Sequence, residues 1–328
     1  MTSASTSALA VHETAQHRAV APDDPPCVEL IGVHKAYRDI SAVRGVDLTI
    51  GHGQCVAVLG PNGAGKSTML DLIVGLQVAD RGTTRVCGLP PSAAVARGEV
   101  GAMLQLGVPI ELLLVRELVA MVASLYPMPR EVDDVLRVAD LERIATRRTS
   151  DLSGGQGQRL RFACALVTGA RLLVLDEPTA ALDVDARASF WAAVRAVAES
   201  GTTVIFATHH LEEADTQADR VVMMAAGRIV ADGPPAELRA QIRARTISAL
   251  LDRPDPSVLA ELPGVSTADV DGHAITLRCD DADRALRELL GAYSDAREIE
   301  VRSAGLDEVF ARLTRAGEPT GLTGEASR

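Results

Sequence analysis

The stretch that decides the fold is GPNGAGKST, residues 60–68. It follows the apolar run CVAVLG (55–60) and opens a helical pattern at its lysine. A glycine, four residues and then Gly-Lys-Ser form a phosphate loop, whose backbone N–H groups curl around nucleotide phosphates. In such loops the lysine reaches the β- and γ-phosphates, the serine hydroxyl ligates Mg²⁺ and the threonine adds a phosphate hydrogen bond. The predicted nucleotide contacts are Gly60, Pro61, Asn62, Gly63, Ala64, Gly65, Lys66, Ser67 and Thr68.

This loop alone leaves the class of nucleotide enzyme open, because GTPases, kinases and motor proteins carry similar phosphate cradles. A guanine-reading Asn-Lys-x-Asp run is absent downstream of the loop. Other parts of the sequence therefore have to decide the class.

Around the loop, short apolar runs alternate with helical patterns. The runs at 55–60, 172–176 and 203–208 are apolar except at their ends, as strands buried on both faces of a parallel sheet are. This alternation predicts an α/β nucleotide-binding fold. Two more strands are predicted at 28–32 and 46–50, and helices at 66–76, 115–125, 155–167 and 185–200.

The composition limits the kinds of partner that are expected. The chain has 328 residues, a net charge of −11 and 2% aromatic residues, so neither a broad phosphate-backbone footprint nor base-stacking platforms are expected. No nucleic-acid partner is predicted. The most apolar segment, 110–125, contains three charged residues and is predicted to pack on protein rather than span a membrane.

The ends and the cysteines point to an intracellular chain. Residues 1–26 lack the basic start and apolar core of a secretory signal and are predicted to be a disordered tail. Five cysteines show neither metal-binding nor redox spacing, so they are interpreted as free thiols in a reducing cytosol.

Two further motifs decide the class. LSGGQGQRL (152–160) opens a helix at an N-cap serine, and LLVLDEP (172–178) is a buried strand that ends in two acids. Ligands meet parallel sheets at the carboxyl ends of their strands. With the phosphate loop first and these motifs following in order, residues 28–245 resemble the ABC ATPase family, whose signature is LSGGQ.

The resemblance implies a site shared between two subunits. In this family the signature of one subunit closes over the ATP held by the phosphate loop of the other, which assigns ATP contacts to Ser153, Gly154, Gly155 and Gln156. Asp176 is expected to hold Mg²⁺, mostly through water. Glu177 is expected to polarise the attacking water as general base.

Smaller elements match the remaining switches of the family. Gln105 matches the glutamine that senses Mg²⁺ and the catalytic water, and Asp183 matches the residue at the dimer contact. His209 matches the histidine that contacts the γ-phosphate, whereas His210 is expected to face solvent. Tyr37 matches the aromatic on which adenine stacks, with a lone surface tyrosine as the alternative.

The resemblance also implies the domain organisation. Residues 27–244 are expected to form the nucleotide-binding domain, a P-loop NTPase core with a RecA-like parallel sheet, an antiparallel β subdomain and a helical subdomain. Residues 245–317 show a βαββαβ pattern with a final helix, which predicts a small α+β accessory domain whose hairpin turns at Asp271–Gly272. Residues 318–328 are predicted to form a second disordered tail.

The predicted function is that of the ATP-binding and ATP-hydrolysing subunit of an ABC transporter. GLDEVFARLT (305–314) resembles the end of ABC-2-type exporter ATPases, including drug and antibiotic exporters. The implied cofactors are ATP and Mg²⁺, and the implied partners are a second copy of the chain and membrane-spanning permease subunits. The implied location is the cytoplasmic face of the membrane. The alternative is a soluble ABC ATPase acting in translation or DNA maintenance.

Overall fold

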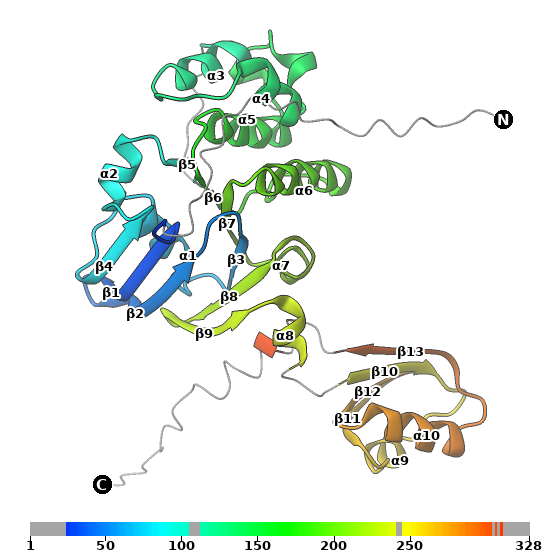
Figure 1. The fold of residues 1–328 in the computed structure, drawn as a ribbon. Helices are drawn as coiled ribbons and strands as arrows, with labels where there is room; N and C mark the ends of the chain where they lie inside the picture. Colours follow the sequence, from blue (N-terminus) through cyan, green and yellow to red (C-terminus); the bar gives the residue numbers. More distant parts are fainter. Residues whose placement is uncertain (1–23, 105–111, 241–244, 304–305, 307–308, 311–328) are drawn as a thin grey trace, which may run out of the picture. The chain divides into compact units, whose positions relative to one another are not determined.

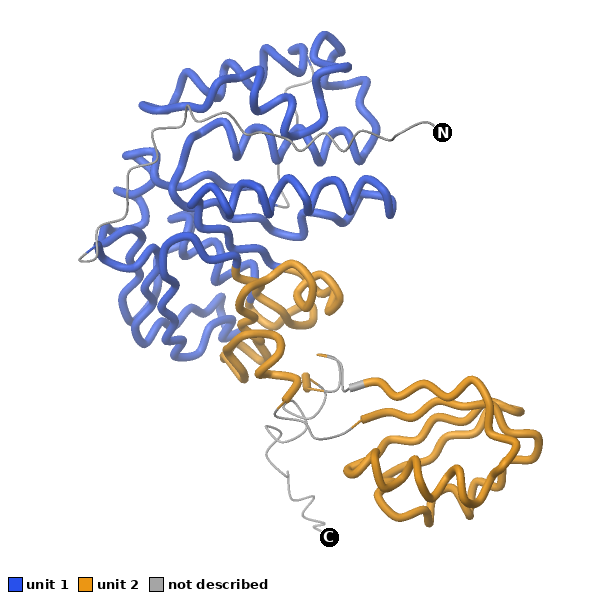
Figure 2. The backbone as a smooth tube through the Cα atoms, turned by 45° about the vertical axis from the view of Figure 1, so that its right-hand side comes forward, with its two compact units in different colours: residues 1–55, 66–207 blue, residues 56–65, 208–328 orange. Residues whose placement is uncertain are grey.

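The structure is a computed structural model that describes residues 24–104, 112–240, 245–303, 306 and 309–310. The chain divides into two compact units, residues 1–55 with 66–207 and residues 56–65 with 208–328 (Figure 2). The predicted domain boundaries stay predictions, since the compact units divide the chain at other positions. The predicted tails and the predicted final helix fall almost entirely outside the described residues.

The first unit contains two groups of strands and most of the described helices (Figure 1). Its strands are β1 (Val28–Tyr37), β2 (Ile40–Ile50), β4 (Arg81–Val86), β5 (Val100–Met103), β6 (Leu172–Asp176) and β7 (Thr203–Thr208). Its helices are α1 (Lys66–Ile73), α2 (Pro91–Ala96), α3 (Val115–Ala123), α4 (Val132–Val138), α5 (Gly154–Leu166) and α6 (Val184–Glu199), with short 3₁₀ turns at Glu142–Ile144 and Thr149–Asp151.

One group of strands is an antiparallel sheet in the order β2-β1-β4. Val28 of β1 lies opposite Ile50 of β2 on one side and Val86 of β4 on the other. The other group is parallel, with Val100 of β5 opposite Leu172 of β6, and Leu172 opposite Thr203 of β7. All residues of β6 and β7 are buried. This matches the prediction of strands covered on both faces.

Helices α5 and α6 are fixed to the parallel strands by aromatic packing. Phe162 of α5 contacts Phe190 of α6 edge to face, with ring centroids 4.9 Å apart. Trp191, the single tryptophan of the chain, lies 4.6 Å from Phe206 of β7. Such aromatic pairs add to the burial of large apolar surface, so they stabilise the packing of α5 against α6 and of α6 against β7.

The second unit contains the strand that leads into the phosphate loop and the C-terminal part of the chain. Its strands are β3 (Cys55–Leu59), β8 (Arg220–Ala225), β9 (Arg228–Gly233), β10 (Arg245–Leu250), β11 (Val265–Asp271), β12 (Ala274–Cys279) and β13 (Arg297–Ser303). Its helices are α7 (Leu211–Gln217), α8 (Pro235–Ala240), α9 (Pro256–Ala260) and α10 (Ala282–Ala292). Strand β3 runs parallel to β8, and β8 pairs antiparallel with β9.

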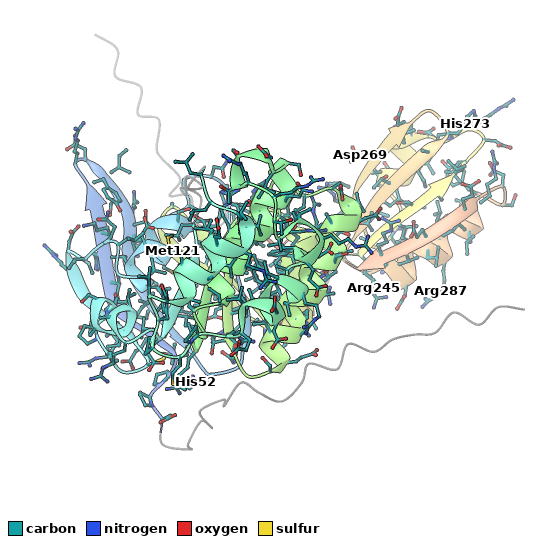
Figure 3. All side chains as sticks on the ribbon, turned by 90° about the horizontal axis from the view of Figure 1, so that it is seen from above. His52, Met121, Arg245, Asp269, His273 and Arg287 are labelled. Carbon is teal, nitrogen blue, oxygen red and sulfur yellow. The ribbon has the colours of Figure 1, made fainter. Side chains whose placement is uncertain are left out.

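Residues 245–303 form a ferredoxin-like arrangement. The element order is βαββαβ, and the antiparallel sheet has the order β11-β12-β10-β13. The predicted hairpin between β11 and β12 is confirmed, with Gly272 in the left-handed region at φ +61°. Figure 3 labels Arg245, Asp269 and His273 among the side chains of this region. Its buried core consists of Ile247, Ala249, Leu251, Leu259, Leu262, Ile275, Leu277, Cys279, Ala282, Ala285 and Leu289.

Candidate functional site

The phosphate loop follows strand β3, whose five residues are all buried. Gly63 and Gly65 take φ values of +81° and +103°, which are accessible to glycine and strained for other residues. A Cβ on Gly63 would meet no atom within 4 Å, so space is left open at the turn of the loop. Gly60 differs: a Cβ there would lie 2.4 Å from the Met224 carbonyl oxygen of β8. The first glycine of the loop is therefore required by packing, and the later ones by backbone conformation.

Gly60→Ala is expected to destabilise the folded protein by about 1–3 kcal/mol, since the added methyl group overpacks a buried strand junction. Thermal unfolding without nucleotide would measure the effect. Gly157→Ala is the matched control, because a Cβ at this helical position meets nothing within 4 Å. Equal melting temperatures for the two variants would contradict the predicted clash.

A cluster of buried charged side chains lies in the first unit, where α1 begins and β6 ends. The Lys66 side chain is 6% exposed, and its Nζ lies 4.0 Å from Oε1 of Glu177, whose side chain is 10% exposed. Burial lowers the pKa of Lys66, and the neighbouring Glu177 and Asp176 carboxylates act in the opposite direction. A cation held this way can interact with a polyanion that enters the cluster.

Asp176 has the environment expected of an Mg²⁺ ligand. Burial raises the pKa of its carboxyl group, and a hydrogen bond with the Ser67 side chain opposes that rise. Its Oδ1 is buried and has no hydrogen-bond partner among the described residues. Such an atom is costly unless a ligand satisfies it. A hydroxyl and a carboxylate suit Mg²⁺, which keeps several waters and takes few protein ligands. The residues present fit the ion.

The backbone at Glu177 is fixed in an unusual conformation. Glu177 has φ +47°, a left-handed value that is uncommon for a residue with a side chain. Its N–H donates to the Ala207 carbonyl oxygen of β7 at 3.0 Å. The buried Gln158 amide of α5 donates to the carbonyl oxygens of Glu177 at 3.2 Å and Pro178 at 2.7 Å. Strain of this kind persists where the surroundings over-determine it, often at functional sites.

Gln158 is a positioning residue that the sequence did not reveal. It lies two residues after the predicted contact Gln156 in LSGGQGQ, and that adjacency is the only sequence feature that pointed to it. Through Gln158 the helix of the signature motif holds the backbone that carries Glu177.

The signature motif lies at the N-terminus of α5. Ser153 is exposed and caps the helix: the Gln156 N–H donates to its Oγ at 3.3 Å, and its own N–H donates to Gln156 Oε1 at 3.1 Å. This reciprocal pair is a capping box. A Cβ on Gly155 would lie 3.4 Å from the Ala181 carbonyl oxygen, so the motif also lies beside the segment before Asp183.

The remaining predicted residues are placed as follows. Asp183 is exposed and caps α6 through the Ala186 N–H at 2.8 Å. Tyr37, at the end of β1, is 41% exposed, and Lys35 Nζ lies 5.5 Å from its ring centroid. Gln105 lies outside the described residues. The predicted roles of all three stay predictions.

The histidines after β7 differ in part from the prediction. His209 is exposed, whereas His210 is half-buried, with the two rings 4.1 Å apart. The His210 N–H donates to the Thr208 hydroxyl at 3.0 Å, and that hydroxyl donates to Glu213 Oε2 at 2.9 Å. His210 is therefore only partly exposed to solvent, and its backbone N–H is fixed where α7 (Leu211–Gln217) begins. The contact of His209 with a γ-phosphate stays a prediction.

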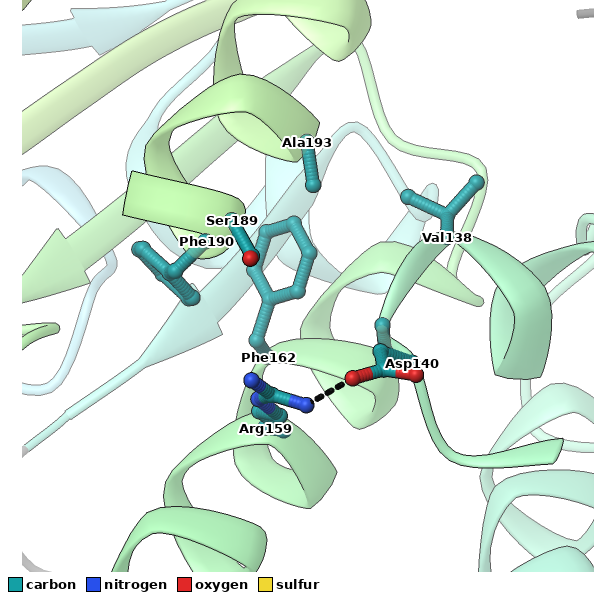
Figure 4. Close-up of a pocket in the computed structure, with 8 residues that line it drawn as sticks. Val138, Asp140, Arg159, Phe162, Ser189, Phe190 and Ala193 are labelled. Atoms are coloured by element: carbon teal, nitrogen blue, oxygen red, sulfur yellow. Dashed lines mark hydrogen bonds and ion pairs between the residues drawn. The ribbon is translucent and has the colours of Figure 1, made fainter. Parts of the chain in front are cut away.

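A small hollow between α4, α5 and α6 is separate from these residues (Figure 4). It is lined by Phe162, Phe190 and Ala193, and the Arg159–Asp140 ion pair lies at its rim. It contains none of the predicted ATP contacts.

The comparisons with known proteins agree with this geometry. The family model described as ABC transporter matches residues 43–180. A Nod factor export ATP-binding protein of Rhizobium leguminosarum bv. viciae is 36% identical over 299 residues, which cover 88% of this chain and 95% of that protein. The chain belongs to the ABC transporter family of ATP-binding subunits. A second such export protein, from Neorhizobium galegae, is 34% identical over 298 residues and covers 88% and 84% of the two chains.

Solved structures of ABC ATPases have the same fold. The ATP-binding subunit of an ABC transporter has 26% sequence identity and a TM-score of 0.60, covering 66% of this chain and 92% of that one. A dimeric ATP-binding cassette in a post-hydrolysis state with ADP and Pi has 28% identity and a TM-score of 0.58, covering 63% and 98%. These findings confirm the predicted P-loop NTPase fold and the ATPase activity of this ABC subunit. Among the described helices, none combines the length and apolar character needed to cross a bilayer.

Proposed function

We propose that two copies of this ABC subunit hydrolyse ATP at shared sites and thereby drive export through separate permease subunits. The observation that carries the proposal is the buried cluster in which Lys66 Nζ lies 4.0 Å from Glu177 and Asp176 Oδ1 is buried without a hydrogen-bond partner among the described residues. A cation, an Mg²⁺ ligand pair and a carboxylate base are the groups that phosphoryl transfer requires.

The proposed chemistry is an in-line displacement by water. Glu177 accepts a proton from the attacking water as its oxygen bonds the γ-phosphorus, and the bond to the bridging oxygen of ADP breaks. Lys66 stabilises the charge that develops on the phosphate oxygens. Ser67 and Asp176, with Gln105 as a further ligand, would hold Mg²⁺, which neutralises phosphate charge. His209 would contact the γ-phosphate.

The signature motif is proposed to act on the ATP of the partner copy. Ser153 is exposed at the N-terminus of a capped 13-residue helix, where backbone N–H groups and the helix dipole favour an anion. The similar cassette solved as a dimer with ADP and Pi supports a paired arrangement. In the proposed dimer of this chain, Asp183 would lie at the contact between the copies, and Tyr37 would stack on adenine.

The names of the two relatives bear on the proposed partners, location and cargo of this chain. Both reported relatives are named as export proteins, which supports a permease partner and a place at the cytoplasmic face of the membrane. The cargo in their names is Nod factor, so a drug or antibiotic cargo has no support from them and stays a prediction. The alternative of a non-transport ABC ATPase is not supported by these names.

Mixing two inactive variants tests the shared site. Ser153→Arg blocks the signature and Lys66→Ala disables the phosphate loop, so each homodimer is expected to be inactive. In a mixed dimer one site has both defects and the other has none. An equimolar mixture of freely exchanging two-fold dimers should therefore recover about a quarter of wild-type ATPase activity.

The matched control is the double variant Ser153→Arg/Lys66→Ala, mixed with either single variant. Each of these mixtures leaves every site with at least one defect, so no activity is expected. If the two single variants recover nothing at any ratio while light scattering shows exchange of subunits, the shared site is contradicted.

A further inference from the structure

Cys27 and Cys87 are distant in sequence but adjacent in the outer antiparallel sheet. Cys27 comes directly before β1 and Cys87 directly after β4, one residue beyond the paired Val28 and Val86. The Cys87 N–H donates to the Cys27 carbonyl oxygen at 2.9 Å. This backbone hydrogen bond brings the two residues together at the end of the sheet, where Cys87 has a left-handed φ of +49°. A disulfide spans Cα atoms that lie about 4.4–6.8 Å apart.

The two thiols interact and differ in their surroundings. Cys27 is fully buried, whereas Cys87 is half-buried. The neighbouring Cys27 thiol lowers the pKa of Cys87, and the Arg171 guanidinium contributes in the same direction. Asp24 and Glu99 act against this shift, as does burial, but the pKa of Cys87 remains below its ordinary value.

Arg171 is held beside the pair by its own contacts. Its guanidinium lies 3.1 Å from Asp24 Oδ2 and 3.4 Å from Nε2 of His52, a residue labelled in Figure 3. His52 Nε2 lies 2.9 Å from the Pro25 carbonyl oxygen. The cation therefore stays near the pair. A lowered thiol pKa, partial exposure and an adjacent second thiol are the features of a peroxide-sensitive cysteine.

We propose that Cys27 and Cys87 are a modification site at which a hydroperoxide converts two thiols into a reversible disulfide. The Cys87 thiolate attacks the peroxide oxygen and forms a sulfenic acid, while the O–O bond breaks and the leaving oxygen departs as water or alcohol after protonation. The Cys27 sulfur then attacks the Cys87 sulfur, the S–S bond forms, and the hydroxyl departs as water with the Cys27 proton. Two thiols are oxidised by two electrons, and one peroxide is reduced.

The other three cysteines provide internal controls. Burial raises the pKa of Cys164 to about 12, and burial with nearby acids raises that of Cys279 to about 11. Cys55 is buried in β3. Protonated or buried thiols react poorly with peroxide, so selective oxidation is expected at Cys87.

The test treats the full chain with one equivalent of hydrogen peroxide, followed by intact-mass measurement and non-reducing peptide mapping. The expected result is a Cys27–Cys87 linked peptide and the loss of two hydrogens, both reversed by dithiothreitol. The disulfide closes a loop of about sixty residues, so the melting temperature is expected to rise by roughly 5 °C or more.

Two variants keep the proposal falsifiable. Cys87→Ser, at the half-buried position, should abolish the link and the thermal shift, while Cys164→Ser should retain both. The proposal is overturned if Cys87 proceeds to sulfinic acid while Cys27 stays reduced, if both thiols remain unmodified, or if the link joins other cysteines.

Discussion

Replacing Glu177 with glutamine is expected to lower the rate of ATP hydrolysis by about 10²–10⁴-fold, because the neutral amide cannot accept the proton of the attacking water. ATP binding should persist, since glutamine keeps the size of the side chain and Lys66 remains in place. Steady-state phosphate release and nucleotide titration would measure the two effects separately. Glu199→Gln is the matched control, because this exposed glutamate ends α6 and belongs to no proposed site.

The same variant should reveal the paired state. If hydrolysis normally opens the dimer, Glu177→Gln with Mg-ATP should accumulate as a dimer in light scattering, and wild type should not. If Glu177→Gln hydrolyses ATP at the wild-type rate, Glu177 is not the general base. A slow variant that stays monomeric with ATP would instead mean that the partner in the site is another chain.

Lys66→Ala is expected to weaken ATP binding by roughly 10–100-fold, since hydrogen bonds to charged groups contribute about 1.5–3 kcal/mol each. The reason is also local: Glu177 and Asp176 would face the triphosphate without the cation that now lies 4.0 Å from Glu177. Equilibrium titration with a fluorescent ATP analogue would measure the change. Arg143→Ala removes an exposed cation from a 3₁₀ turn and should bind normally. Equal affinities for the two variants would show that Lys66 does not contact the phosphates.

The sequence predicted some of the buried strands and missed others: β5 and β8 were not predicted, although most of their residues are buried. Strands β6 and β7 begin and end at the predicted residues. Both faces of these strands are covered, so nearly every position is apolar and the run is easy to delimit in the sequence. Strands β4 and β9 were missed, since RGTTRV is largely exposed, RIVADG is mostly half-buried, and neither carries a strong period. Their pairing partners, β1 and β8, are what make them strands.

The residue types of the candidate site could be predicted from the sequence, but the contacts that hold these residues in place could not. The order of the phosphate loop, signature and acidic strand end identified Lys66 and Glu177 directly. The left-handed backbone at Glu177 and the Gln158 hydrogen bonds that fix it depend on contacts between distant segments. The cysteine spacing likewise gave no indication that Cys27 and Cys87 share an edge of the sheet, because register between strands decides that contact.

The pairing of β10 with β13 has a consequence for how the C-terminal segment could be acquired or lost. Arg245, where the ferredoxin-like segment begins, lies opposite Ser303, where it ends. The two ends of the segment therefore lie next to each other, and its buried core consists of its own side chains. A segment with adjacent ends can be excised or transplanted with a short splice. We therefore expect that residues 245–303 can be deleted and the flanking residues joined without unfolding the sequence that precedes them.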